Sequence, residues 1–152
     1  MMFTASQLIA HAFGDYVLQS HWMATEKTKR SLAALAHVAT YGLPFLFLRP
    51  SWLALFVIVS THFVIDRWRL ARYVCWLKNF IGPRRLCLLD AERYVSLNIH
   101  QVHERWLRNY HWDECSATGF APDTPPFLAV WLLIIVDNLM HVAINGLALA
   151  YL

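Results

Sequence analysis

The 152-residue sequence has few charged residues and few cysteines. Charged residues make up 15% of the chain, against about 25% in a typical soluble domain, while 58% of the residues are hydrophobic. We therefore do not expect a water-soluble fold. Three cysteines without a Cys-x-x-Cys spacing give no disulfide framework and fit a reducing compartment. The N-terminus lacks a basic region and a small-residue cleavage site, so we expect no cleaved signal peptide.

Several common enzyme motifs are also missing. The sequence contains no Gly-x-Ser-x-Gly nucleophile elbow, no His-Glu-x-x-His zinc helix and no P-loop. The chemistry of serine hydrolases, of zinc proteases with that helix and of P-loop NTPases is therefore not indicated. Aromatic residues, by contrast, are frequent: seven Trp, six Tyr and nine Phe. Such enrichment is typical of membrane–water interfaces.

Four apolar segments predict an all-α, polytopic membrane bundle of about four transmembrane helices. They cover about residues 4–24, 31–48, 52–66 and 126–152. A helix that crosses the hydrocarbon core needs about 20 residues, with a range of roughly 17–25. We expect one membrane domain over residues 1–152.

A cytoplasmic insertion of about residues 67–125 is expected between the third and fourth spans. It should carry amphipathic helices over residues 67–81 and 90–110, the first of them ended by Gly82 and Pro83. A turn-rich stretch follows from Cys115 to Pro126.

Basic residues are distributed unevenly between the two sides of the predicted bundle. Lys27, Lys29 and Arg30 lie between the first two spans, and most of the other basic residues follow the third. Arg49 stands alone on the opposite side. The positive-inside rule therefore places both basic regions in the cytoplasm and both termini outside.

Histidine and aspartate recur inside the apolar segments. Three segments contain one of each, four residues apart, which places both side chains on one helix face, and the second segment contains a further histidine. These residues are His11, Asp15, His37, His62, Asp66, Asp137 and His141. A rise of 1.5 Å per residue makes one cluster in the cytoplasmic half of the bundle geometrically feasible. Because an ionisable residue in hydrocarbon costs about 2.5–3.5 kcal/mol, the aspartates need partners.

A divalent metal would supply those partners. Mixed imidazole and carboxylate ligation favours Zn, Mn or Fe, and helical bundles build such sites from residue pairs on facing helices. A site with an open coordination position lowers the pKa of bound water and so supports hydrolysis. Two alternatives stay open at this point: structural hydrogen bonds within and between helices, and a relay for ions or protons.

Other histidines are weaker candidates. His100, His103 and His111 could form a zinc site with Cys115, since His-x-x-His spacing permits it. They lie in a polar, amphipathic region, which favours ordinary surface histidines. We interpret Lys27 mainly as a determinant of topology.

Four motifs carry a resemblance to a known family. The first is His11-Ala-Phe-Gly-Asp15-Tyr-Val-Leu-Gln19, followed by Trp22-Met-Ala and Lys27; the others are His37 with Tyr41-Gly-Leu-Pro44, Thr61-His62-Phe-Val-Ile-Asp66, and Asp137-Asn138-Leu-Met-His141. In their order they resemble the small bacterial and phage membrane proteins described as domain of unknown function 3307. The resemblance implies a bacterial inner-membrane protein and supplies no activity. Over residues 67–125 it is thin.

Two functions compete on this sequence. The first is a metal-dependent membrane hydrolase that acts on a lipid or another amphipathic substrate. The second is a non-enzymatic phage or bacterial factor that binds a host membrane protein and uses the His–Asp pairs structurally. As partners we expect membrane lipids, and beyond them a membrane protein or a second copy of the chain, but no nucleic acid.

Overall fold

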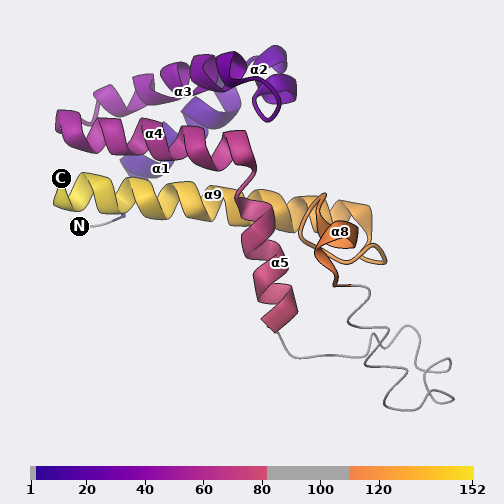
Figure 1. The fold of residues 1–152 in the computed structure, drawn as a ribbon. Coiled ribbons are helices and arrows are strands. Elements are labelled where there is room, and N and C mark those ends of the chain that lie inside the picture. The colour runs from indigo at the N-terminus through magenta and orange to yellow at the C-terminus, as the bar shows by residue number, and fades with distance from the viewer. Residues whose placement is uncertain (1–2, 82–109) are drawn as a thin grey trace, which may run out of the picture. The chain divides into compact units, whose positions relative to one another are not determined.

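The computed structural model describes residues 3–81 and 110–152, and every regular element in these two ranges is a helix. The elements are α1 (Ala5–Ala12), the π-helix η1 (Phe13–Val17), α2 (His21–Glu26), α3 (Ser31–Leu46), α4 (Trp52–Trp68), α5 (Ala71–Ile81), α8 (Trp112–Cys115) and α9 (Pro126–Tyr151) (Figure 1). This confirms the predicted all-α class. The helix predicted over residues 90–110 lies almost wholly outside the described residues, as do His100 and His103.

The chain divides into two compact units. Unit 1 comprises Met1–Leu70 and Asp137–Leu152, and unit 2 comprises Ala71–Val136, so that α9 contributes to both. The prediction of one membrane domain over residues 1–152 is not tested by this division and stays a prediction.

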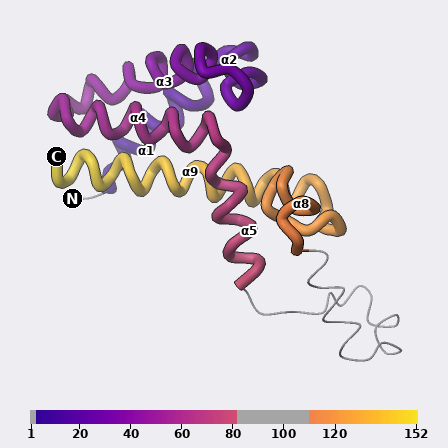
Figure 2. The backbone as a smooth tube through the Cα atoms, viewed as in Figure 1, coloured from indigo at the N-terminus to yellow at the C-terminus, as the bar shows by residue number. Residues whose placement is uncertain are grey.

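Unit 1 is an antiparallel arrangement of four helical segments, which lie side by side in Figure 1. The α1–η1 segment is antiparallel to α9. Gln7 donates to the carbonyl of Val142 at 2.7 Å, and His11, further along the chain, contacts the earlier residue Asn138 at 2.9 Å. Helices α3 and α4 also run in opposite directions, as the backbone tube shows (Figure 2). At the end of unit 1 where α3 finishes and α4 begins, small and aromatic side chains form an apolar cluster: Ala10, Tyr41, Phe45, Ala54, Ile58 and Ala148.

Local sequence explains where these helices begin and end. The hydroxyl groups of Thr4, Ser20 and Ser51 accept hydrogen bonds from backbone N–H groups in the first turns of α1, α2 and α4. Such caps satisfy donors that have no partner inside the helix. At its other end, α4 stops where Arg69 takes the left-handed conformation, with φ of 51°.

The π-helix η1 depends on Gly14. A Cβ atom at this position would lie 2.8 Å from Cδ2 of Tyr41 and 2.9 Å from the Tyr41 carbonyl oxygen. The missing side chain therefore lets η1 approach the backbone of α3 closely. Each hydrogen bond of a π-helix spans one residue more than that of an α-helix, so η1 also changes which residues share a face.

Within the described part of the chain, one helix is long and apolar enough to cross a membrane by length and composition. This helix is α9, with 26 residues. The predicted count of four spans is not supported by this criterion. The segment over 4–24 is divided among α1, η1 and α2, and α3 and α4 have 16 and 17 residues, short of the roughly 20 that a full crossing needs.

Unit 2 contains α5, α8 and the first part of α9. Cys75, Phe120 and Ala129 form its apolar cluster, and Trp76 donates a hydrogen bond to the Tyr110 carbonyl at 2.9 Å. Helix α5 covers Ala71–Ile81, so its start is Ala71 rather than residue 67, because α4 continues to Trp68. The predicted end at Gly82 and Pro83 lies outside the described residues.

Candidate metal site

The interior of unit 1 contains a polar region in addition to its apolar cluster. Eight polar or charged side chains are almost fully buried there: Gln7, His11, Asp15, His37, His62, Asp66, His141 and Asn145. Buried polar groups are retained only with partners, and buried charges are paired or bind metals. The interior of this unit is therefore where a functional site is expected.

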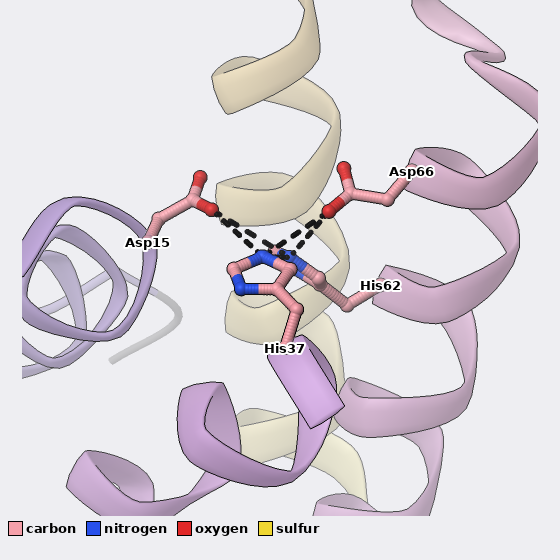
Figure 3. A group of neighbouring side chains, drawn as sticks. All are labelled: Asp15, His37, His62 and Asp66. Atoms are coloured by element: carbon pink, nitrogen blue, oxygen red, sulfur yellow. Dashed lines mark hydrogen bonds and ion pairs between the residues drawn. The ribbon is translucent and has the colours of Figure 1, made fainter. Parts of the chain in front are cut away.

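Four of these side chains converge from three elements. We call them the four-donor group: Asp15 on η1, His37 on α3, and His62 with Asp66 on α4 (Figure 3). Their carboxylates and Nε2 atoms point toward one another, and the four donor atoms all lie within 4.8 Å of each other. His62 and Asp66 are one helical turn apart and share a face, as their spacing predicts.

Five donor distances lie within about 0.3 Å of those expected in a tetrahedral metal centre. Nε2 of His37 lies 3.2 Å from Asp15 Oδ1 and 3.2 Å from Asp66 Oδ2, and the two Nε2 atoms are 3.0 Å apart. Nε2 of His62 lies 3.1 Å from Asp66 Oδ2 and 3.7 Å from Asp15 Oδ1. A tetrahedral Zn²⁺ with bonds of about 2.0–2.2 Å holds its ligand atoms about 3.3–3.6 Å apart. The residues present therefore fit a divalent metal.

The carboxylate oxygens that face the centre of the group are incompletely satisfied. Asp15 Oδ1 and Asp66 Oδ2 are buried and lie in ion-pair range of imidazoles, yet neither receives a well-oriented hydrogen bond within the described residues. Buried oxygens of this kind are rare without a bound partner. A cation held between them would complete their coordination.

Lys27 lies beside the four-donor group and reaches three of its members, including Nε2 of His37 at 3.4 Å. Its ammonium lies 2.8 Å from Asp66 Oδ2 and 3.9 Å from Asp15 Oδ1, and it donates to Gln19 Oε1 at 2.8 Å. Because Lys27 lies among other basic residues, it was predicted as a determinant of topology and not as a site residue. The one available signal was its position in the first of the four motifs.

A second group of donors shares Asp66. We call it the three-donor group: Asp66, Asp137 and His141. Nε2 of His141 lies 3.4 Å from Asp66 Oδ1 and 3.5 Å from Asp137 Oδ2. The Asp137 and His141 side chains are one turn apart on α9, as predicted from their spacing. The two oxygens of Asp66 thus belong to different groups.

Aromatic stacking fixes the orientation of the rings. The His62 imidazole is stacked between Tyr41 and His141, with centroid distances of 3.7 and 3.9 Å. The Tyr41 hydroxyl accepts a hydrogen bond from Asn145 Nδ2 at 2.7 Å. The stack links the two groups and limits rotation of His62.

His11 lies outside both donor groups. Its Nδ1 is 2.9 Å from the Tyr41 hydroxyl, and its Nε2 is 2.9 Å from Asn138 Oδ1. His11 and Asp15, which their spacing predicts as a pair, have different contacts: Asp15 lies in the π-helix and pairs with His37, while His11 contacts Tyr41 and Asn138. As a metal ligand, His11 stays a prediction.

Of the four weaker candidates, His111 and Cys115 lie in the described residues, and the Cys115 N–H donates to the His111 carbonyl at 3.2 Å. His111 is exposed and lies 3.4 Å from the Asp113 carboxylate. Cys115 is buried, and burial raises the pKa of its thiol, with the nearby Glu114 and Asp123 acting in the same direction.

Fold and site together define a protein whose described residues form only helices and hold a buried cluster of carboxylates and imidazoles that could bind a metal ion. The chain belongs to the family described as protein of unknown function (DUF3307), whose model matches residues 3–103. The matched region includes the whole four-donor group and Lys27, and ends before α9. Comparisons with curated proteins and with solved structures gave no match.

Proposed function

We propose that this chain is an integral membrane protein in which a divalent metal, held by the four-donor group, supports hydrolysis of a lipid or another amphipathic substrate. The observation that carries the proposal is the convergence of two Nε2 atoms and two carboxylate oxygens, all within 4.8 Å of one another, with each Nε2 3.0–3.7 Å from the other three atoms. Zn, Mn and Fe are the ions that mixed imidazole and carboxylate ligands favour.

The distribution of apolar residues supports membrane integration. In unit 1 the buried layer is rich in histidine and aspartate, while large apolar side chains such as Leu35, Phe56 and Leu139 are exposed. Exposed apolar surface on this scale marks contact with a membrane or a partner, and buried ionisable groups that face a bundle interior are typical of membrane proteins. The four antiparallel segments of unit 1 would give an even number of crossings.

The short helices fit a bilayer that adapts to them. Trp52 and Trp68, at the two ends of α4, have 84% and 52% of their surface exposed. Sixteen residues of rise separate them by about 24 Å, against a hydrocarbon core of about 30 Å. Interfacial tryptophans and local thinning accommodate such a mismatch at modest cost.

The site lies toward the basic end of unit 1. Arg67 donates hydrogen bonds to the carbonyls of Thr28 and Lys29, at 2.7 and 3.2 Å, and so joins the end of α4 to the connection between α2 and α3. Asp66 is the residue before Arg67. Under the positive-inside rule this end faces the cytoplasm, which gives an amphipathic substrate access from the inner leaflet.

Different residues of the chain would have different roles in the reaction. The metal would lower the pKa of a bound water, which is the usual route to a nucleophile at neutral pH. The four-donor group would hold the ion, and the stack of Tyr41 on His62 would keep one imidazole in place. Lys27, partly exposed at 17%, would attract an anionic headgroup toward the site.

A structural role for the cluster is the second candidate, and Lys27 is the observation that favours it. The contact between Lys27 and Asp66 at 2.8 Å already supplies a cation to the carboxylates. The protein would then act without chemistry, by binding another membrane protein. Removal of one partner from such a buried pair is strongly destabilising, so both candidates predict damage from mutation, and metal content distinguishes them.

The test is metal content of the purified, detergent-solubilised protein, measured by mass spectrometry after incubation with Zn, Mn or Fe. We expect about one or more ions per chain in the wild type and a loss of at least tenfold in affinity in His37→Gln and His62→Gln. His111→Gln is the matched control, because His111 is exposed and outside both groups. A wild type that binds none of the three ions would contradict the metal proposal. Metal-loaded protein would then be assayed against lipid vesicles.

A further inference from the structure

Asp66 presents its two carboxylate oxygens to two separate sets of donors. Oδ2 faces His37 and His62, at 3.2 and 3.1 Å, and Oδ1 faces His141 at 3.4 Å. Asp66 is 4% exposed, so neither of its carboxylate oxygens is solvated by bulk water. A carboxylate in this position is placed to bridge two cations.

The three-donor group has its own unsatisfied atom. Nε2 of His141, a residue with 1% exposure, has no hydrogen-bond partner in the described ranges, yet it points at Asp66 Oδ1 and Asp137 Oδ2. Its distances to these oxygens, 3.4 and 3.5 Å, are those expected of ligands on one ion with bonds of about 2.0–2.2 Å.

We propose that Asp66, Asp137 and His141 form a second divalent-metal site, so that Asp66 bridges a two-metal centre. This inference rests on the proposed function, since the first ion is the one held by the four-donor group. Two ions that share a carboxylate in catalytic centres lie about 3.5–4 Å apart. The second site has three protein donors, which leaves coordination positions open for water or substrate.

The charges of the cluster bear on what a two-ion centre would bind. Asp15, Asp66 and Asp137 contribute three negative charges when ionised, and Lys27 contributes one positive charge close to two of them. With neutral imidazoles, one divalent ion brings this set to zero and two ions make it positive. A centre with surplus positive charge binds an anionic ligand, which fits a lipid with a phosphate or carboxylate headgroup.

Manganese provides a direct test, because a pair of Mn²⁺ ions bridged by a carboxylate gives an exchange-coupled electron paramagnetic resonance spectrum, whereas an isolated ion gives a six-line spectrum. The detergent-solubilised full-length protein would be loaded with Mn²⁺ and examined by both mass spectrometry and this resonance. We expect two ions per wild-type chain with the coupled spectrum. Asp137→Asn and His141→Gln should each retain one ion, with the six-line spectrum.

Asp113→Asn is the control, since Asp113 is exposed at 84% and outside both groups, and it should keep two coupled ions. Circular dichroism and the elution volume in size-exclusion chromatography verify that each variant is folded. If one of the two α9 variants does not fold, the other still tests the second site. One ion per wild-type chain, unchanged in Asp137→Asn, would overturn the second site and leave the first intact. No ion in the wild type would overturn both.

Discussion

The Lys27 ammonium lies 2.8 Å from Oδ2 of Asp66, the same oxygen that faces the imidazoles of His37 and His62. One oxygen is thus shared between a lysine and a candidate metal position. An ammonium and a metal ion that share a carboxylate oxygen compete for its charge, so the state of Lys27 should govern how strongly the protein depends on metal.

Replacement of Lys27 tests this competition. Lys27→Gln removes the charge that stabilises Asp66 in the metal-free protein, so we expect the free energy of unfolding of that form to fall by about 3 kcal/mol. Bound Zn²⁺ should restore most of the loss, because it takes over the carboxylates. Thermal unfolding with and without Zn²⁺ measures both effects. Lys29→Gln is the control: its ion pair with Glu26 is largely exposed, and its loss should cost less than about 1 kcal/mol. Equal responses of the two variants would contradict the competition.

Much of this site follows from spacing alone. His62 and Asp66, and likewise Asp137 and His141, are one turn apart on regular α-helices, so a four-residue spacing placed each pair correctly. Between His11 and Asp15 the chain passes from α1 into the π-helix Phe13–Val17, so the spacing rule of a regular α-helix does not apply to this pair. Nothing in hydrophobic periodicity signals such a change.

Contacts between distant segments were harder to predict. The sequence identifies Tyr41 only as a residue one turn after His37, whereas the structure gives it partners on α1, α4 and α9. Lys27 was assigned to topology from its charge, and its contact with Asp66 arises only when the connection before α3 folds back on α4. These outcomes depend on packing among helices, for which a single sequence holds no local signal.

Tyr41 should matter for stability more than for metal binding. Tyr41→Phe removes the hydroxyl that contacts His11 and Asn145. Both of these side chains then lose a buried hydrogen-bond partner, which should lower the free energy of unfolding by about 1–3 kcal/mol. The ring that stacks on His62 is retained, so the number of bound ions should not change. Tyr41→Leu removes the stack as well and should lower metal affinity. Unfolding curves and metal titrations of the two variants, side by side, measure these effects; loss of metal in Tyr41→Phe would assign the hydroxyl a role in ligation.

Gly14 should be required for the position of Asp15. Gly14→Ala places a methyl group 2.8–2.9 Å from the ring and the carbonyl oxygen of Tyr41, so the backbone of η1 has to move away from α3. We expect a loss of about 1–3 kcal/mol in stability and a fall of at least tenfold in metal affinity. Gly42→Ala is a matched control, since its methyl group would meet only the ends of two side chains, Val59 at 3.0 Å and Leu55 at 3.9 Å. A fall in affinity of the same size in both variants would show that the effect is not specific to η1.

The environment of the exposed apolar surface can be tested on α4. Phe56 lies in the second turn of this helix and is 69% exposed. In water, Phe56→Arg would be neutral or favourable, because an exposed ring is replaced by a solvated charge. In hydrocarbon the same change costs about 2.5–3.5 kcal/mol, and it should lower the fraction of protein that resists carbonate extraction from membranes. Trp52→Arg, at the start of α4, is the control and should have a smaller effect, because an arginine at a helix end reaches the headgroups. If both variants stay fully in the carbonate-resistant fraction, the face of α4 that carries Phe56 packs against protein rather than lipid. If carbonate releases the wild type itself, the proposal of membrane integration is contradicted.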